Sequence, residues 1–278
     1  MAILQVAVDK GWFKEKGLDV SLFSGGGGGN TLRVASSGDA DMAIAGNTSV
    51  VMAARRAGSD LKIVAPWFQV NDFYWITAKD GVDFKKAKLG FSSAGSTTEL
   101  SVKALQKKYP GISTQGVGAE GDNWAAAKAG RIDAGWAMHP FVTEAEQKDK
   151  AKRLIAARDH IGDFPADLVA VNEEYAAANK DNLTAFFTVV DRAFDYVVQE
   201  PEKAAADLAP LLELDEEVMV KALKDTPEPA KAYSLKVDPQ GLKNLSDLMV
   251  QTGQLKEPID WAKSLDQSYL PADARAKF

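Results

Sequence analysis

The sequence predicts an α/β protein with two lobes. Segments with the features of strands and helices alternate from residue 18 to residue 158, as in a parallel sheet with helices on its faces. The alternation runs through two similar units, residues 18–68 and 72–158, which suggests one sheet for each lobe. Ligands of such sheets bind outside the carboxyl ends of the strands, so the turns that follow strands are the candidate sites.

The first unit alternates helices with strands from its beginning. The expected elements are a helix ending at residue 17, a strand at 18–24, a helix from residue 30, a strand at 40–46, a helix at 47–58 and a strand at 61–68. Asn30 is a good N-cap residue, and Leu32 and Ala35 then share one face of the helix that follows it. These spacings predict one packed unit.

Five consecutive glycines, in "SGGGGGN" at residues 24–30, stand between a predicted strand and a predicted helix. A linker is excluded because both flanks belong to one packed unit. A Walker loop needs a Lys and a Ser or Thr after its last glycine, and no Lys follows here. The dinucleotide pattern fits trivially because every position is glycine. A surface turn and a loop that contacts a ligand remain, and we expect ligand contact because the loop follows a strand.

The second unit repeats the order of the first and leads into a helical segment. We expect strands at 72–79, 88–93, 113–118, 133–139 and 152–158, with helices between them. After residue 173, "NLTAFFTVVDRAFDYVVQ" carries apolar residues at helical spacing and ends before Pro201. Further helices are expected around 202–213, 215–224 and 239–252.

The segment "SSAGSTTE", residues 92–99, is the clearest candidate site. Ser96 followed by Glu99 fits a capping box at the start of a helix. Exposed N–H groups and hydroxyls at such a helix start can also bind a sulfonate, phosphate or carboxylate. The segment "AGNTS", residues 45–49, has the same character in the first unit. We therefore expect an anion site with one contribution from each unit.

Aromatic residues stand at or just beyond several predicted strand ends. Trp67, Trp124 and Trp136 can pack in the core or line a pocket, and the sequence leaves both open. His139 has no acid or nucleophile partner nearby in the sequence, so it is expected to bind or pack rather than to act as a base. No arginine is evident in the pocket, which favours an organic anion held mainly by N–H and hydroxyl groups.

Composition excludes several classes of function. The net charge of −6 disfavours a nucleic-acid partner. The absence of cysteine excludes disulfides, a cysteine nucleophile and cysteine metal sites, and two histidines leave little room for a histidine metal site. We expect a monomer without metal or cofactor. No signal peptide is recognised at the start, which fits either a cytoplasmic protein or a mature or trimmed chain.

The order of several motifs resembles a family of transport proteins. The motifs are "KGWFKEKGLDVSLFSGGGGGN", "VASSGDADMAIAGNTSVVMAARRAGSDLKIVA", "KLGFSSAGST", "AAKAGRIDAGWAMHPF" and "GQLKEPIDW". In this order the chain resembles, over about residues 8–271, the solute-binding proteins of ABC importers for nitrate, taurine, aliphatic sulfonates and thiamin pyrimidine precursors. Two departures are the missing strand and loop that usually open the family's fold, and a glycine run longer than the usual two or three.

The resemblance implies the type II periplasmic-binding-protein fold, with two lobes joined by a two-strand hinge. One lobe would comprise residues 1–75 and 172–278, the other residues 76–171, with hinge strands in 72–79 and 167–174. The chain would be periplasmic or otherwise extracytoplasmic and would deliver a small organic anion to a membrane permease. The implied ligand contacts are Gly26, Gly27, Asn30, Gly46, Asn47, Thr48, Trp67, Phe68, Gln69, Ser93, Gly95, Ser96, Thr97, Asn123, Trp124, Trp136, His139 and Pro140.

Three alternatives stay open. The first is a protein that binds a pyrimidine precursor. The second is an enzyme on the same fold, but the related eukaryotic pyrimidine synthases carry a cysteine-rich motif and this chain has no cysteine. The third is the sensor domain of a transcription regulator, which would need a DNA-binding helix-turn-helix, and no basic N-terminal segment is present. Chemical conversion of a bound ligand would distinguish the enzyme from the binding proteins.

Overall fold

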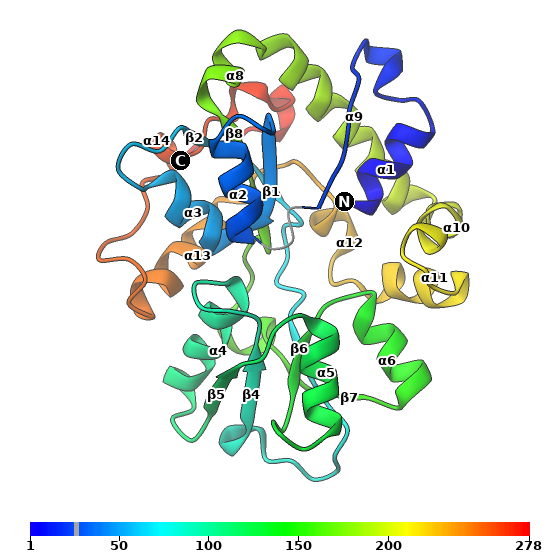
Figure 1. The fold of residues 1–278 in the computed structure, drawn as a ribbon, viewed down its shortest axis with the longest axis vertical. Coiled ribbons are helices and arrows are strands. Elements are labelled where there is room, and N and C mark those ends of the chain that lie inside the picture. Colours follow the sequence, from blue (N-terminus) through cyan, green and yellow to red (C-terminus); the bar gives the residue numbers. More distant parts are fainter. Residues whose placement is uncertain (25–27) are drawn as a thin grey trace.

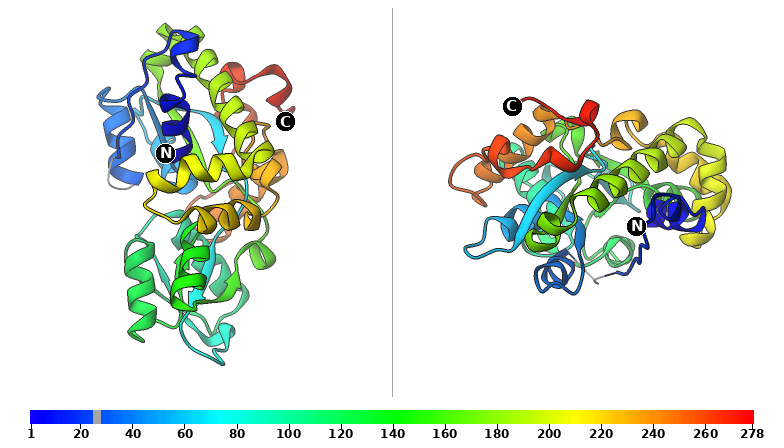
Figure 2. Two further views of the ribbon diagram at one scale, coloured as in Figure 1. Left: turned by 90° about the vertical axis from the view of Figure 1, so that its right-hand side faces the viewer. Right: turned by 90° about the horizontal axis from the view of Figure 1, so that it is seen from above.

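Two lobes are stacked along the long axis of the molecule (Figures 1 and 2). The computed structural model describes residues 1–24 and 28–278. Lobe 1, at the top of Figure 1, contains a sheet of three strands in the order β1-β8-β2. These strands are β1 (Met42–Gly46), β2 (Leu61–Trp67) and β8 (Asp167–Asn172). The predicted α/β class and two-lobed fold are confirmed.

The sheet of lobe 1 is not the parallel sheet that the sequence predicts. β8 pairs antiparallel with both β1 and β2, so β1 and β2 run in the same direction with a returning strand between them. The alternation along the chain correctly indicates the direction of β1 and β2. It cannot reveal β8, because that strand arrives only after the whole of lobe 2.

The N-terminal segment differs from its prediction in two places. The helix expected to end at Gly17 is a short 3-10 turn, η1 (Lys14–Lys16), and the regular helix α1 (Ala2–Asp9) lies upstream. The strand expected at 18–24 is wrong: residues 18–24 have no strand structure, and Phe23 is 55% exposed. Strand-forming residues alone do not make a strand when no neighbouring strand pairs with their backbone groups.

Two helices pack against the sheet of lobe 1. They are α2 (Gly28–Ser36) and α3 (Asn47–Ala54). Leu32 and Ala35 are buried, as predicted. Asn30 is not the N-cap, because α2 already begins at Gly28. Its side-chain oxygen instead accepts hydrogen bonds from the guanidinium of Arg33, at 2.8 and 3.2 Å.

Lobe 2 contains the five strands between β2 and β8. The strands are β3 (Tyr74–Thr77), β4 (Lys88–Phe91), β5 (Ser113–Gly116), β6 (Gly135–Ala137) and β7 (Lys152–Ala156). β3 pairs antiparallel with β6 and β7, and β4 pairs parallel with β5. The helices are η2 (Phe84–Lys86), α4 (Thr97–Lys108), α5 (Glu120–Lys128), α6 (Phe141–Asp149) and α7 (Arg158–Ile161).

Two segments cross between the lobes, residues 68–73 between β2 and β3 and residues 162–166 between α7 and β8. Hydrogen bonds join the two segments. The backbone N–H of Asn71 donates to the carboxylate of Asp163 at 2.6 Å, and the Asn71 side chain donates to the carbonyl of Gly162 at 2.8 Å. Sheet membership assigns β3 to lobe 2 and β8 to lobe 1, so the second crossing ends before Asp167. The lobe boundaries expected at residues 75/76 and 171/172 stay a prediction. The sheets would put the boundaries a few residues earlier, before Tyr74 and before Asp167.

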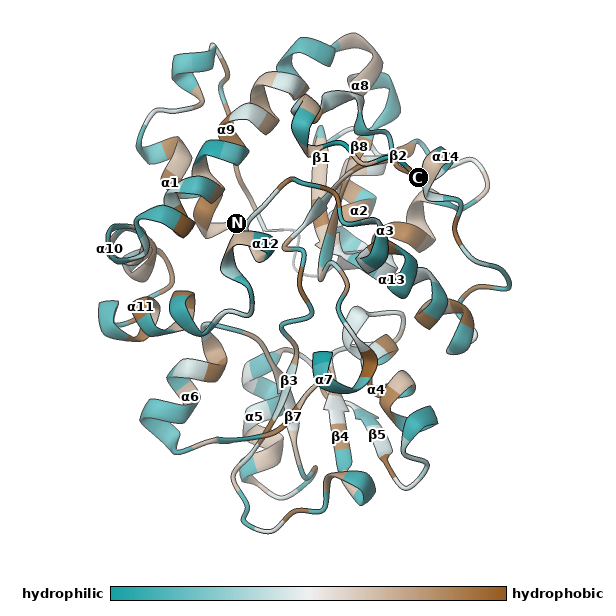
Figure 3. Cartoon of the chain, turned by 180° about the vertical axis from the view of Figure 1, so that it is seen from behind, coloured by the Kyte–Doolittle hydropathy of each residue, from teal (hydrophilic) through white to brown (hydrophobic). Residues whose placement is uncertain are grey.

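The C-terminal third of the chain is helical, as predicted. Its elements are α8 (Glu173–Ala178), α9 (Lys180–Gln199), α10 (Pro201–Leu211), α11 (Glu216–Asp225), α12 (Pro229–Ala232), α13 (Pro239–Gln251), α14 (Trp261–Ser264), η3 (Gln267–Tyr269) and η4 (Ala272–Ala274). α11 contacts α6 and α13 contacts α4 in lobe 2, and η3 contacts β2 in lobe 1, so this region touches both lobes. α11 and α13 carry many hydrophilic residues (Figure 3). Within residues 1–24 and 28–278, no helix has both the length and the apolar character that crossing a membrane requires.

Candidate functional site

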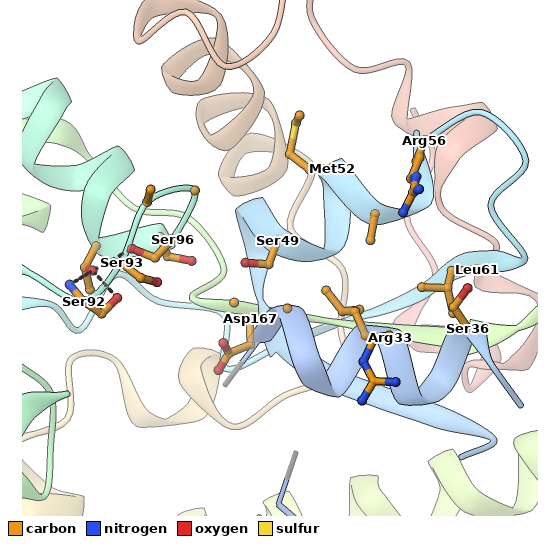
Figure 4. Close-up of a pocket in the computed structure, with 18 of the residues that line it drawn as sticks. Arg33, Ser36, Ser49, Met52, Arg56, Leu61, Ser92, Ser93, Ser96 and Asp167 are labelled. Atoms are coloured by element: carbon orange, nitrogen blue, oxygen red, sulfur yellow. Dashed lines mark hydrogen bonds between the residues drawn. The ribbon is translucent and has the colours of Figure 1, made fainter. Parts of the chain in front are cut away.

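A cavity of about 1230 Å³ is lined by residues of both lobes (Figure 4). Lobe 1 contributes α2, α3 and the first residue of β8, and lobe 2 contributes the loop before α4, the turn before α5 and residues that include Trp136. The volume exceeds the usual 300–1,000 Å³ of a small-molecule pocket. The cavity therefore leaves room for a small ligand and for further closure of the lobes.

Hydroxyl groups dominate the lobe-2 side of the cavity. Ser96 is the N-cap of α4, and its hydroxyl accepts a hydrogen bond from the backbone N–H of Glu99 at 3.1 Å. The Glu99 carboxylate accepts from the backbone N–H of Gly95 at 2.7 Å, one residue before the position of an ordinary capping box. The Thr98 hydroxyl lies 2.8 Å from that of Ser92 and 2.9 Å from that of Ser96. The predicted helix start is thus an ordered cluster of hydroxyls.

Two hydrogen bonds join the lobes beside this cluster. The Thr97 hydroxyl donates to the side-chain oxygen of Asn47 at 3.0 Å, and the Thr48 hydroxyl donates to the carbonyl of Gly95 at 2.8 Å. We call this pair of bonds the interlobe contact. Asn47, Thr48 and Thr97 are buried. A Cβ at Gly46 would lie only 2.9 Å from the Thr97 hydroxyl oxygen, so glycine at residue 46 lets the lobes approach.

The described lining residues include three ionisable side chains, Arg33, Arg56 and Asp167. This corrects the expectation of a pocket without arginine. Arg33 and Arg56 are exposed, whereas burial raises the pKa of Asp167 to about 6, with the amino group of Met1 acting in the opposite direction. Figure 4 shows Asp167 between the Ser92–Ser96 loop and Arg33 of α2. The cavity thus contains charges of both signs.

Apolar side chains form the rest of the lining, including Leu32, Phe73, Trp136 and Met138. The rings of Phe73 and Trp136 are 6.3 Å apart, and the Trp136 indole N–H donates to the carbonyl of Gly118 at 3.1 Å. This hydrogen bond fixes the indole ring at the wall of the cavity. An organic group of a ligand could pack against this aromatic and aliphatic surface.

Some of the predicted ligand contacts line this cavity. They are Gly46, Ser93, Gly95, Ser96, Thr97 and Trp136. Asn30 lies on α2 between the lining residues Gly29 and Arg33. Asn47 and Thr48 make the interlobe contact, and Gly26 and Gly27 lie outside the described residues. Ligand contact by these residues stays a prediction.

The remaining predicted contacts are not among the lining residues of the cavity, and most of them have other structural partners. Trp67 packs on Phe194 with ring centroids 4.9 Å apart, and the Trp124 indole donates to Asp149 at 2.6 Å. Phe68 and Gln69 belong to the first crossing segment, where the Gln69 side chain donates to the carbonyls of Ser234 and Lys236. Asn123 donates to the carbonyl of Gly118, His139 bonds the Thr143 hydroxyl, and Pro140 is the N-cap of α6.

Several lining residues escaped the sequence analysis: Arg33, Ser49, Phe73 and Asp167. Arg33 and Ser49 each lie within one helical turn of a predicted contact, so helix periodicity could have identified them. Asp167 is different, because it stands at the amino end of its strand. It lies opposite Gly46 in the antiparallel register. The expectation that ligands bind at the carboxyl ends of strands therefore does not identify it.

Among the described residues, no group of three or more His, Asp or Glu side chains is placed to hold a metal ion. Asn47 bonds the Thr97 hydroxyl, Thr48 bonds the carbonyl of Gly95, and the Ser96 hydroxyl caps α4, so none of these side chains pairs with a general base. The geometry suits the binding of a small molecule that has a charged end and an organic body.

Comparison with known proteins agrees with this geometry. A family model described as "NMT1/THI5 like" matches residues 1–204. A search of curated protein sequences finds no match.

Three solved structures illustrate the similarity of fold. The periplasmic aliphatic sulphonate binding protein SsuA from Escherichia coli is 17% identical, with 100% of this chain and 92% of that chain covered and a TM-score of 0.72. The ligand-binding component of an ABC-type import system from Staphylococcus aureus, with zinc bound, is 17% identical over 96% and 93% of the two chains, with a TM-score of 0.74. A cysteine-to-serine mutant of the desulfurization enzyme DszB, in complex with biphenyl-2-sulfinic acid, is 11% identical over 96% and 94%, with a TM-score of 0.68.

Proposed function

This chain belongs to the NMT1/THI5-like family, and we propose that it is the solute-binding protein of an ABC importer, which captures a small organic anion between its lobes. The observation that carries the proposal is the cavity itself, which the two lobes line with hydroxyls, two arginines and aromatic residues. The similarity in fold to solute-binding proteins with a TM-score above 0.7 supports it.

The anionic end of the ligand is assigned to the Ser92–Thr98 loop. Backbone N–H groups at the start of α4 favour negative charge, and the Ser93 hydroxyl is exposed beside them. Arg33 from the opposite lobe adds a positive charge to the same cavity. A sulfonate or carboxylate would satisfy both surfaces at once, and Trp136 and Phe73 would pack on its organic body.

A role outside the cytoplasmic membrane, as a monomer that delivers its ligand to a permease, completes the proposal. The E. coli protein of similar fold is described as periplasmic, and the S. aureus protein as part of an ABC-type import system. A nucleic-acid partner does not fit the net charge of −6.

An enzyme is the second candidate, because DszB has the same fold. The solved DszB mutant replaces a cysteine, whereas this chain contains none, so it cannot use a cysteine nucleophile. We therefore favour binding without conversion. Ligand recovered after long incubation and identified by mass spectrometry should be chemically intact, and any converted product would assign the chain to the enzymes.

The direct test is mass spectrometry of the ligand that co-purifies with the chain, followed by titration calorimetry with that compound and a panel of alkanesulfonates. Buffers must contain no sulfonate. Small-angle scattering should show compaction at saturation, because lobes on two crossing segments close by rotation. A chain that binds no organic anion, or whose radius of gyration does not change at saturation, would contradict the proposal.

A further inference from the structure

The side chain of Asn123 does not line the cavity, yet it bonds two residues that do. Its amide donates to the carbonyl of Gly118 at 2.8 Å and to the carbonyl of Ala119 at 3.2 Å. Gly118 and Ala119 both line the cavity, whereas Asn123 is 0% exposed in the first turn of α5. This buried amide therefore holds the cavity wall from behind.

The carbonyl of Gly118 accepts a second hydrogen bond from the wall itself. The indole N–H of Trp136 donates to it at 3.1 Å. The Asn123 amide and the Trp136 indole thus share one acceptor oxygen. Because the amide restrains this oxygen, it also restrains the orientation of the ring that bonds it.

Two glycines fix Asn123 in its place. β4 and β6 lie beside α5 in lobe 2 (Figure 1), and Gly90 of β4 and Gly135 of β6 face Asn123. A Cβ at Gly90 would overlap the side-chain oxygen of Asn123, and a Cβ at Gly135 would lie 2.6 Å from its backbone oxygen. The amide therefore has little freedom to move, as positioning another group requires.

The side-chain oxygen of Asn123 is buried and has no hydrogen-bond partner among the described residues. Burying a polar atom without a partner is costly. An apolar side chain would avoid this cost, so the filling of space does not account for an asparagine here. What the amide adds is its pair of hydrogen bonds to Gly118 and Ala119.

We propose that Asn123 is a positioning residue of the ligand site, which orients the Trp136 indole through the carbonyl of Gly118 and so fits the cavity wall to the organic body of the ligand. This inference rests on the proposed function and adds a residue that does not touch the ligand. The anionic end binds the Ser92–Thr98 loop and does not depend on Asn123. Affinity for the organic body depends on Asn123, and capture of the anionic group does not.

Hydrogen exchange of the indole N–H groups tests the first step without a ligand. Asn123→Ala removes the amide, and Asn123→Leu removes it while filling the space, so either folded variant serves. In nuclear magnetic resonance spectra, exchange of the Trp136 indole N–H should become about 3- to 10-fold faster. The Trp261 indole donates to the carbonyl of Leu242 at 2.9 Å in the same manner, and its exchange should not change. Unchanged exchange at Trp136, or equal acceleration at both indoles, would overturn the proposal.

Titration calorimetry with two sulfonates tests the second step. Benzenesulfonate and methanesulfonate share the anionic group and differ in the organic body. Asn123→Ala should weaken binding of benzenesulfonate about 3- to 10-fold and binding of methanesulfonate less than about 2-fold. When Asn123→Ala is introduced into the Trp136→Phe variant, binding of benzenesulfonate should weaken less than about 2-fold, because the indole that Asn123 orients is already absent.

Asn179→Ala is the matched control. The Asn179 amide donates to the carbonyl of Tyr175, four residues earlier, at 3.1 Å, the same spacing as between Asn123 and Ala119. Asn179 does not line the cavity, so both affinities should equal those of the wild type. A loss of affinity in this variant equal to that in Asn123→Ala would overturn the role of Asn123.

The outcomes separate the two proposals. Equal losses of affinity for both sulfonates in Asn123→Ala would overturn the role of Asn123 and leave the proposed function intact. An undiminished effect of Asn123→Ala in the Trp136→Phe variant would also overturn it. If neither sulfonate binds the wild type, the proposed function fails for sulfonates, and hydrogen exchange still decides whether Asn123 orients the indole.

Discussion

Replacement of Thr97 by valine tests whether the interlobe contact stabilises the arrangement of the lobes. Valine has the shape of threonine and lacks only the hydroxyl. In the structure that hydroxyl donates to the side-chain oxygen of Asn47 at 3.0 Å, and Thr97 and Asn47 are 5% and 0% exposed. The substitution therefore leaves a buried amide oxygen without its donor.

The cost follows from this burial. A buried acceptor that loses its partner destabilises a protein by about 1–3 kcal/mol. The Asn47 amide still donates to the carbonyl of Pro165 at 2.6 Å, so its side chain cannot turn freely toward water. We expect Thr97→Val to lower the free energy of unfolding by about 2 kcal/mol. When Thr97→Val is introduced into the Asn47→Ala variant, it should cost less, because the Asn47 oxygen that accepts the hydrogen bond is already absent.

Urea unfolding of the wild type and the variants measures this difference as a lower midpoint with an unchanged slope. Thr184→Val is the matched control, because the Thr184 hydroxyl bonds only the carbonyl of Lys180 on the exposed side of α9. Its effect should stay within about 0.5 kcal/mol. Equal effects of Thr97→Val and Thr184→Val would refute a stabilising interlobe contact.

Three further substitutions test individual groups. Ser96→Ala removes the N-cap of α4 and should lower stability by about 1 kcal/mol; an unchanged denaturation midpoint would show that the cap contributes nothing. Arg33→Gln should weaken binding of an alkanesulfonate about 3- to 10-fold and reduce its salt dependence; identical calorimetric titrations would remove Arg33 from the site. Burial raises the pKa of Asp72 from 3.8 to about 7, so the folded state keeps a proton that the unfolded state releases. Wild-type stability should therefore fall as the pH rises from about 4 to about 7, and Asp72→Asn should fall less steeply in urea midpoints across that range; equal slopes would contradict this.

The sequence identified the hydroxyl loop of the candidate site because its signal is local. A serine followed three residues later by a glutamate predicts a capped helix start, and Ser96 does cap α4. The glutamate itself bonds Gly95 rather than Ser96, a detail of loop geometry that spacing does not specify. Trp136 stood at a strand end like Trp67 and Trp124, and nothing in the sequence distinguished the cavity wall from the core.

The sequence by itself determined the alternation of strands and helices, the two units, the helical C-terminal third and the start of α4, because each of these depends on neighbouring residues. The tertiary structure alone decided that β8 inserts between β1 and β2, that residues 18–24 lack a partner strand, and that Asn47 and Thr97 join the lobes. It also placed Asp167 opposite Gly46 and beside the anion loop. The physical reason is that hydrogen-bond partners and charges act through space, so residues far apart in the chain acquire a joint role only when the lobes come together.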